Sequence, residues 1–242
     1  MFLSEKVTIS ENGGDFINSK ALSENLEDNL INLRSLMSNS SDLNIKHGQV
    51  GNTKICIIHC EGMASTKTMA ELIFRPLNEM RKDCQLSPQK LIETLRDEVL
   101  IAGEQQTVTD FSALTHAIMS GFAAILANGC AQGLAIGVQG FAVRSVSEPS
   151  THSNIRGSLD GFVETIRTNM SLVRRRIKSP DLVFELKPYG SATKTDVCLC
   201  YMKGKVSPEL LSGVRKKLEE LPFEAILEGG FIQPFLEKKG SG

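Results

Sequence analysis

This sequence has few aromatic side chains and no excess of either charge. Tryptophan is absent from the 242 residues, and only two tyrosines occur. Because ligand pockets are commonly lined by aromatic groups, the sequence argues against a sugar-binding cleft built as an aromatic box. The 27 basic and 28 acidic residues give a net charge of −1. A dedicated nucleic-acid-binding domain carries a clear basic excess, so we expect no nucleic-acid partner.

Signals for secretion, disulfide bonding and metal binding are also missing. The opening residues MFLSEKVTISENGG lack a basic segment followed by an apolar core, so we predict no secretory signal. The six cysteines show no framework spacing, which favours a reducing compartment. No cysteine or histidine pattern has the spacing of a zinc site. We find no nucleophile motif, phosphate loop or carboxylate pair, and therefore expect no metal, no cofactor and no catalytic residues.

A long uncharged segment raises the question of a membrane span. No Asp, Glu, Lys or Arg occurs between Asp110 and Arg144, and this length would cross a bilayer. Three glycines at a spacing of four residues resemble the packing motif of membrane helices. The dipeptide Asn128-Gly129 is instead typical of a turn. We predict a helix up to Ala127, a turn and glycine-rich strands rather than a membrane span.

The expected fold class is α/β of the mixed α+β type, with two small α/β subdomains and a cleft or hinge between them. The break is the polar segment EPST, Glu148 to Thr151, which interrupts the surrounding pattern. The predicted divisions are a flexible lead over 1–18, a first subdomain over 19–147, a hinge loop over 148–158, a second subdomain over 159–237 and a tail or cloning remnant over 238–242.

Hydrophobic period and capping residues predict the individual elements. For the first subdomain we expect a helix capped by Ser19 and ending at Met37, a loop over 38–52, a buried strand over 53–60, and helices from Thr66, from Pro88 and after Asp110. For the second we expect a helix over 159–178, strands over 182–187 and 195–202, a helix over 207–220, a strand over 223–227 and a short last helix. This order suits a two-layer sandwich.

The helix expected over 159–178 ends in a dense basic tract. At 100° per residue its apolar residues form one stripe, and Arg167 and Arg174 lie together at the edge of that stripe. Arg175 and Arg176 point in other directions, so we interpret them as a solvated helix end that the helix dipole favours. Arg167 and Arg174 either pair carboxylates across the interdomain cleft or bind a carboxylate of a ligand. We favour the ion pair.

The same tract carries a family resemblance. The stretch SVSEPSTHSNIRGSLDGFVETIRTNMSLVRRRIKSPDL resembles the A subunits of GerA-type spore germinant receptors of endospore-forming bacteria. The shared pattern is EPST, then IRG, then GF, RTN, RRRI and SPDL. It continues in GSATKTDVCLCYMKGKVSPELL and in ILEGGFIQPFLE. The resemblance covers most of the chain.

The resemblance implies the amino-terminal soluble domain of such an A subunit, ahead of a membrane domain. The full-length protein would lie in the spore inner membrane, with this domain on the cytoplasmic side. Its partners would be the B and C subunits and other A subunits. The domain would be non-enzymatic and would contribute to nutrient sensing and signal transduction in spore germination.

Two functional classes stay open for this domain. In the first, a small nutrient, an amino acid or a sugar, binds in the interdomain cleft. In the second, the domain is a subunit-assembly or oligomerisation module with no ligand site of its own. In either class the expected ligand-binding or inter-subunit residues are Glu148, Arg156, Arg167 and Arg174.

The preference for an ion pair generates a first prediction. Replacing Arg167 with alanine is expected to lower the melting temperature measurably, because the guanidinium would leave a carboxylate unpaired. Thermal unfolding of the parent and the variant measures this. Unchanged melting combined with a lost response to a ligand would instead favour the ligand-binding interpretation.

Overall fold

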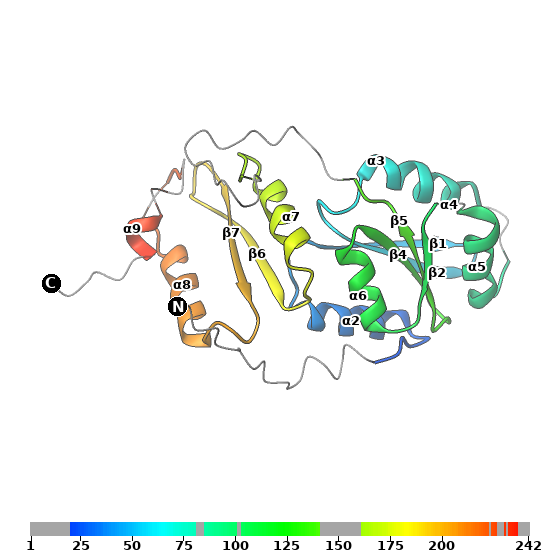
Figure 1. Ribbon diagram of the computed structural model, residues 1–242. Helices are drawn as coiled ribbons and strands as arrows, with labels where there is room; N and C mark the ends of the chain where they lie inside the picture. Colours follow the sequence, from blue (N-terminus) through cyan, green and yellow to red (C-terminus); the bar gives the residue numbers. More distant parts are fainter. Residues whose placement is uncertain are drawn as a thin grey trace, which may run out of the picture.

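The computed structural model describes residues 20–80, 85–100, 103–140, 161–222, 224–226, 230 and 232–236. Within these residues helices combine with a five-stranded and a two-stranded antiparallel sheet, which confirms the mixed class (Figure 1). The five-stranded sheet belongs to a first unit, residues 20–140, and the two-stranded sheet to a second unit, residues 161–236. The expected hinge over 148–158 lies outside the described residues, so the domain boundaries stay a prediction.

The larger sheet has the strand order β1-β2-β4-β5-β3. Its strands are β1 (Leu43–Val50), β2 (Thr53–Cys60), β4 (Phe122–Ala127), β5 (Gly133–Gly137) and β3 (Gln105–Val108). Each neighbouring pair is antiparallel. A tight turn joins β1 to β2, and it places Gly51 at a φ of 55°, where glycine avoids the steric penalty of a side chain. The two outer strands, β1 and β3, form the edges of the sheet.

Helices cover both faces of this sheet, as Figure 1 shows. One face carries α2 (Leu26–Leu36) and α6 (Phe111–Met119). The other carries a helical segment made of α3 (Thr66–Met69), the π-helical turn η1 (Ala70–Phe74) and α4 (Arg75–Met80), followed by α5 (Pro88–Thr94) and η2 (Leu95–Val99). Successive residues of β2 serve the two cores in turn, Cys56 and Ile58 on the α2 side and Ile55 and Ile57 on the other.

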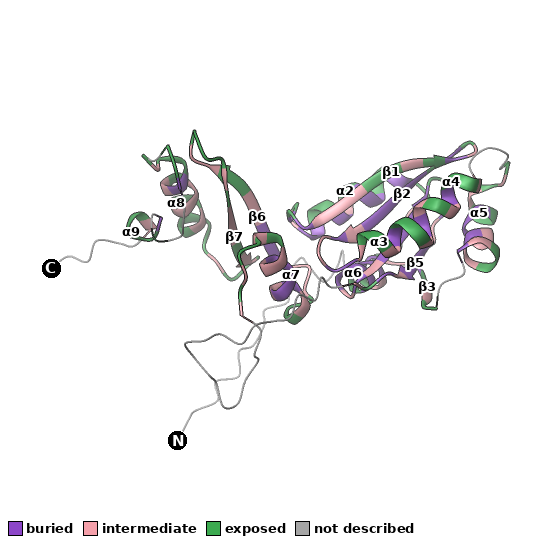
Figure 2. Cartoon of the chain, turned by 90° about the horizontal axis from the view of Figure 1, so that it is seen from above, coloured by how far each residue is buried: buried purple, intermediate pink, exposed green. Residues whose placement is uncertain are grey.

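The second unit is built around a hairpin of β6 (Leu182–Tyr189) and β7 (Thr195–Met202). Helix α7 (Ile166–Arg176) packs on one face through Met170, against Leu182 and Phe184. Helices α8 (Pro208–Glu219) and α9 (Gln233–Leu236) lie on the other face. Burial in this unit is lower than in the first, where the sheet is enclosed on both sides (Figure 2).

Several expectations for the first unit are wrong at their boundaries. The first helix begins at Leu26, capped by Asn25, whose side chain accepts from the backbone N–H of Glu27 and Asp28. The supposed loop over 38–52 contains β1. As an edge strand β1 leaves many side chains in water, so its sequence LNIKHGQV has the polarity of a loop. The short strand β3 was not expected.

The uncharged segment after Asp110 is also organised differently. Asp110 caps α6 as predicted, accepting from the N–H of Ala113 at 2.8 Å, but the helix ends at Met119. The residues from Phe122 to Ala127 form β4 instead. The sequence does not distinguish the two structures here, because a short apolar run without a clear period fits a buried strand as well as a helix. Among the described helices, none has both the length and the hydropathy needed to cross a bilayer.

Predictions based on local signals succeed elsewhere. The buried strand β2, the helix from Thr66 and the proline-started helices α5 and α8 are confirmed, as is the β6–β7 hairpin. In the second unit α7 begins at Ile166, later than expected, and the described residues Glu224 to Ile226 form no strand. That segment is an irregular connection, in which the carbonyl of Ile226 accepts from the Thr195 hydroxyl at 2.6 Å.

An ionic cluster holds α8 against the hairpin. Glu185 on β6 accepts from Arg215 Nε of α8 at 2.9 Å and from the Tyr201 hydroxyl at 2.6 Å. A second bond joins Arg215 Nη2 to the same carboxylate. These hydrogen bonds, that of Arg215 first, hold the pKa of Glu185 below its ordinary value. The arginine remains partly exposed, so solvent weakens the pair.

This cluster predicts a pH-dependent contribution to stability. A depressed folded-state pKa means that the carboxylate stabilises the fold above its unfolded pKa and loses this effect as pH falls through the folded pKa. The Glu185→Gln variant is therefore expected to lose about 0.5–1 kcal/mol of unfolding free energy at about pH 7. The difference should shrink towards about pH 3 in urea unfolding series. A difference independent of pH would contradict this role.

Candidate functional site

A buried arginine–aspartate pair joins α7 to the first unit. The side chain of Arg174 is 0% exposed and that of Asp42, which precedes β1, is 2% exposed. Arg174 Nε donates to Asp42 Oδ2 at 2.7 Å, and Nη2 donates to Oδ1 at 3.1 Å. This two-pronged pairing fixes the orientation of both groups as well as their distance.

Further contacts complete the surroundings of the guanidinium. Arg174 Nη1 donates to the carbonyl of Ser179 at 2.7 Å, and Nη2 donates to the carbonyl of Leu182 at 2.8 Å. Met119 Sδ lies 3.8 Å from Nη1, and the ring centroid of Phe184 lies 5.1 Å from Cζ. Every nitrogen of the guanidinium therefore has an acceptor inside the protein. In this arrangement Arg174 holds the structure together and offers no donor to a ligand.

The chain just before Asp42 runs beside β6. The N–H of Ser41 donates to the carbonyl of Phe184 at 2.8 Å, and the N–H of Phe184 donates to Ser40 Oγ at 2.9 Å. Ser40 Oγ also donates to Asp42 Oδ1 at 2.6 Å. The N–H of Leu186 donates to Ser41 Oγ at 3.0 Å. Backbone and ionic contacts thus tie the two units at the same place.

A second pair lies seven residues earlier on α7, where Arg167 bonds the carboxylate of Glu61. Its side chains are 49% and 32% exposed, in contrast to the enclosed Arg174 pair. Glu61 follows β2 directly, and its N–H donates to the carbonyl of Asp42 at 2.7 Å. Both arginines expected at the edge of the apolar stripe therefore reach carboxylates of the first unit. One does so in the interior and the other at the surface.

A cavity of about 420 Å³ lies beside the exposed pair. Gly62, at a φ of 74°, lines the cavity where no side chain would fit, because a Cβ there would stand 2.6 Å from Cβ of Ser171 on α7. Ser65 caps the next helix by accepting from the N–H of Thr68 at 3.1 Å. Most of the lining residues have polar side chains: Glu61, Gly62, Ala64, Ser65, Thr66, Gly140, Arg167, Thr168, Ser171 and Arg175.

The lining offers one side-chain carboxylate, guanidinium groups and several hydroxyls, which suits a small ligand with both an anionic and a cationic group. Gly140 is the last described residue before 141–160, so Glu148 and Arg156 lie outside the described residues. Asp42, Ser40 and Glu61 were not expected as site residues. Helical periodicity could not identify them, since Asp42 precedes its partner by 132 residues.

The described residues where the two units meet provide neither a reactive cysteine nor a metal site. Burial raises the pKa of the Cys60 thiol, and the nearby Asp42 charge adds to the effect. Burial likewise raises the pKa of Cys56 to about 12. A reactive cysteine needs a lowered pKa, so both behave as small apolar core residues. In the described part of the chain, no three metal-ligating side chains gather.

The two pairs on α7 are expected to differ in energy. Arg174→Met removes a cation and leaves Asp42 charged and buried, which should lower the unfolding free energy by about 3–5 kcal/mol. Arg167→Ala removes an exposed partner and should cost less than about 1 kcal/mol. The decrease predicted for Arg167 from the sequence is thus a small one. Urea unfolding of both variants measures the difference.

A double variant provides the control for this prediction. Asp42→Leu combined with Arg174→Met removes both charges and should recover part of the stability lost in the single variant. Equal losses for Arg174→Met and Arg167→Ala would show that the buried pair lacks the role described above.

Comparison with known sequences gives a consistent set of relatives. The family model for the Bacillus/Clostridium GerA spore germination protein matches residues 31–241. Spore germination protein KA of Bacillus subtilis (strain 168) is 31% identical over 219 residues, which cover 89% of this chain and 40% of that protein. The uncharacterized membrane protein YfkQ of the same organism is 33% identical over 220 residues, which cover 90% of this chain and 42% of that protein. The chain spans about two fifths of the length of these relatives.

A solved structure has a similar fold. The N-terminal domain of the A subunit of the Bacillus megaterium spore germinant receptor GerK3 matches with a TM-score of 0.66 and 25% identity. The match covers 90% of this chain and 80% of that chain. The resemblance inferred from the EPST-to-SPDL motif is thereby confirmed. With the family model covering most of its length, this chain belongs to the GerA spore germination protein family.

Proposed function

We propose that this chain is a sensing module of a spore germinant receptor A subunit and that the cavity beside Arg167 and Glu61 binds a small zwitterionic nutrient. The observation that carries the proposal is the pairing of opposite charges, one from each unit, at a polar cavity. The similarity to the N-terminal domain of the GerK3 A subunit supports the receptor assignment.

An amino acid matches the charges of this site. Its carboxylate would pair with Arg167 and its ammonium group with Glu61, replacing the bond between these two side chains. An exposed ion pair contributes less than about 1 kcal/mol, so opening it costs little. Hydroxyl groups of Thr168 and Ser171 lie in the same lining. A sugar fits less well, because the described lining contains no aromatic side chain on which its ring could stack.

A ligand bound in this cavity would contact both units. Arg167 belongs to α7 and Glu61 to the end of β2, so the ligand would bridge two elements that the protein already joins through Arg174 and Asp42. A ligand shifts a conformational equilibrium only by its differential affinity for the two states. A ligand that contacts both units would have different affinities for two states in which the spacing of the units differs. Nutrient occupancy would in this way become a signal.

The cellular setting is part of the same proposal. The module would act without catalysis in the spore inner membrane receptor, on the cytoplasmic side, with B and C subunits and other A subunits as partners. The relatives named as spore germination proteins, and the one named as a membrane protein, support this setting. Contact with the membrane would come through a membrane domain outside this chain.

A second candidate function is subunit assembly. Leu210 on α8 is 60% exposed, and this helix covers one face of the β6–β7 hairpin. An apolar side chain in water gains free energy when a partner buries it. In this alternative the chain holds neighbouring A subunits together and binds no nutrient.

Calorimetric titration of the chain with the common amino acids and with glucose tests the proposal. At least one amino acid should bind, and Arg167→Ala and Glu61→Gln should each weaken its binding by about tenfold or more, equivalent to about 1.4 kcal/mol. Lys90→Ala, which removes an exposed cation from α5, is the matched control and should bind as the parent does. Absence of heat from every compound, together with self-association abolished by Leu210→Ser in sedimentation experiments, would support assembly instead.

A further inference from the structure

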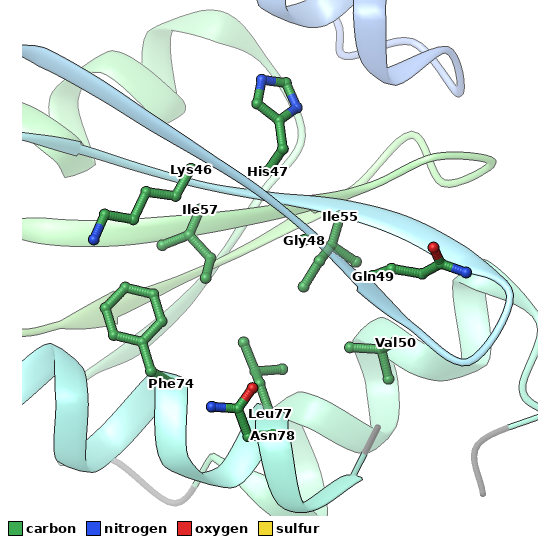
Figure 3. Close-up of a pocket in the computed structure, with 10 residues that line it drawn as sticks. All are labelled: Lys46, His47, Gly48, Gln49, Val50, Ile55, Ile57, Phe74, Leu77 and Asn78. Carbon is green, nitrogen blue, oxygen red and sulfur yellow. The ribbon is translucent and has the colours of Figure 1, made fainter. Parts of the chain in front are cut away.

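A second cavity of about 300 Å³ lies in the first unit, between the edge strand β1 and α4 (Figure 3). It is separate from the junction cavity and shares no lining residue with it. Its walls are largely apolar, formed by Val50, Ile55, Ile57, Phe74 and Leu77. Cavities of this size and apolar character, with a few polar groups at the rim, are typical of small-molecule sites.

A glycine in the middle of β1 opens this cavity. Gly48 is paired with Ile55 in the β1–β2 register, so a side chain at position 48 would project onto the same face as Ile55. The backbone does not require glycine there, because a Cβ would lie 3.5 Å from Ile55 Cγ1, an ordinary contact, and φ lies outside the left-handed region. Glycine in a strand interior lowers strand stability and often marks a place where a ligand approaches.

The opposite wall begins at a π-helical turn. The turn η1 ends at Phe74, and the cavity residues Leu77 and Asn78 follow on α4. An inserted π-turn rotates the residues after it relative to a regular α-helix and is frequent at functional sites. Two local departures from regular structure, a strand glycine and a π-turn, thus meet at one cavity.

The rim carries a cation but no anion. Lys46 Nζ lies 5.0 Å from the ring centroid of Phe74, and Asn78 on α4 lines the cavity from the helix that faces the strand (Figure 3). The ten lining residues include no Asp or Glu. A ligand with a single negative group would find a partner here, whereas the ammonium group of a zwitterion would find none. The junction cavity differs, since its lining contains charges of both signs, Glu61 as well as Arg167 and Arg175.

We propose that this cavity binds a short aliphatic monocarboxylate. The hydrocarbon chain would lie in the space left by Gly48, against Ile55 and Ile57. The carboxylate would contact the ammonium group of Lys46 and the amide of Asn78. This inference does not depend on nutrient binding at the junction, and either site can exist without the other.

Nuclear magnetic resonance with sodium octanoate, kept below its micelle concentration, tests the inference on the 242-residue chain. Saturable shifts are expected for the backbone amides of Gly48, Ile55 and Ile57, with a dissociation constant of about 1 mM, the range for a ligand of this size. Octylammonium chloride at equal concentration should bind at least about fivefold more weakly, because its head group is repelled by Lys46. Absence of saturable shifts at these amides, or equal binding of the amine, would overturn the proposal.

Variants separate the cavity from the surface charge. Gly48→Val should fill the cavity, abolish octanoate binding and leave the melting temperature equal or higher, because valine suits a strand. Lys46→Ala should weaken binding by about fivefold. Lys54→Ala removes the same charge from the other face of β2 and should leave affinity unchanged. Unaltered binding in Gly48→Val would overturn the location, and unaltered binding in Lys46→Ala would overturn the head-group contact.

Discussion

The burial of Arg174 is the constraint on which the rest of the junction depends. A guanidinium withdrawn from water is tolerated only when a carboxylate and enough acceptors surround it. Asp42, the carbonyls after α7 and the hydroxyl of Ser40 meet this need, and they come from segments far apart in the chain. The register of α7 against the first unit is therefore fixed by one side chain. The position of Arg167 opposite Glu61 follows from that register.

The two pairs on α7 have different physical characters and suit different tasks. A buried pair adds little net stability compared with apolar packing, yet it strongly penalises any arrangement that separates its charges. An exposed pair exchanges partners easily because water screens both charges. The Arg174 pair accordingly specifies one docking geometry. The Arg167 pair, only two turns away, is exposed enough for the exchange of carboxylates that the proposed binding requires.

Local signals in the sequence predict local structure here, and fail where a distant partner decides. Asp110 caps the helix expected after it, and Ser87 and Ser207 cap the expected helices α5 and α8, since a cap depends only on nearby backbone groups. Strand β1 was missed because its place at the sheet edge, which no local pattern encodes, permits polar residues. The stripe geometry placed Arg167 and Arg174 together and favoured carboxylate partners. It could not identify Asp42 and Glu61 as the partners, because a contact between residues far apart in the chain produces no periodic pattern in the sequence.

The two cavities differ in charge but share a wall-forming helix. Ser65 and Thr66 at its beginning line the junction cavity, whereas Phe74 and Leu77 line the cavity beside Gly48. The π-turn η1, which ends at Phe74, separates Ser65 and Thr66 from Leu77. Because the inner strand β2 is enclosed by side chains on both faces, it resists displacement. The helix that lines both cavities should move more easily than β2, because its π-turn already departs from regular hydrogen bonding. If a bound ligand displaced either wall, we would expect the helix to move first.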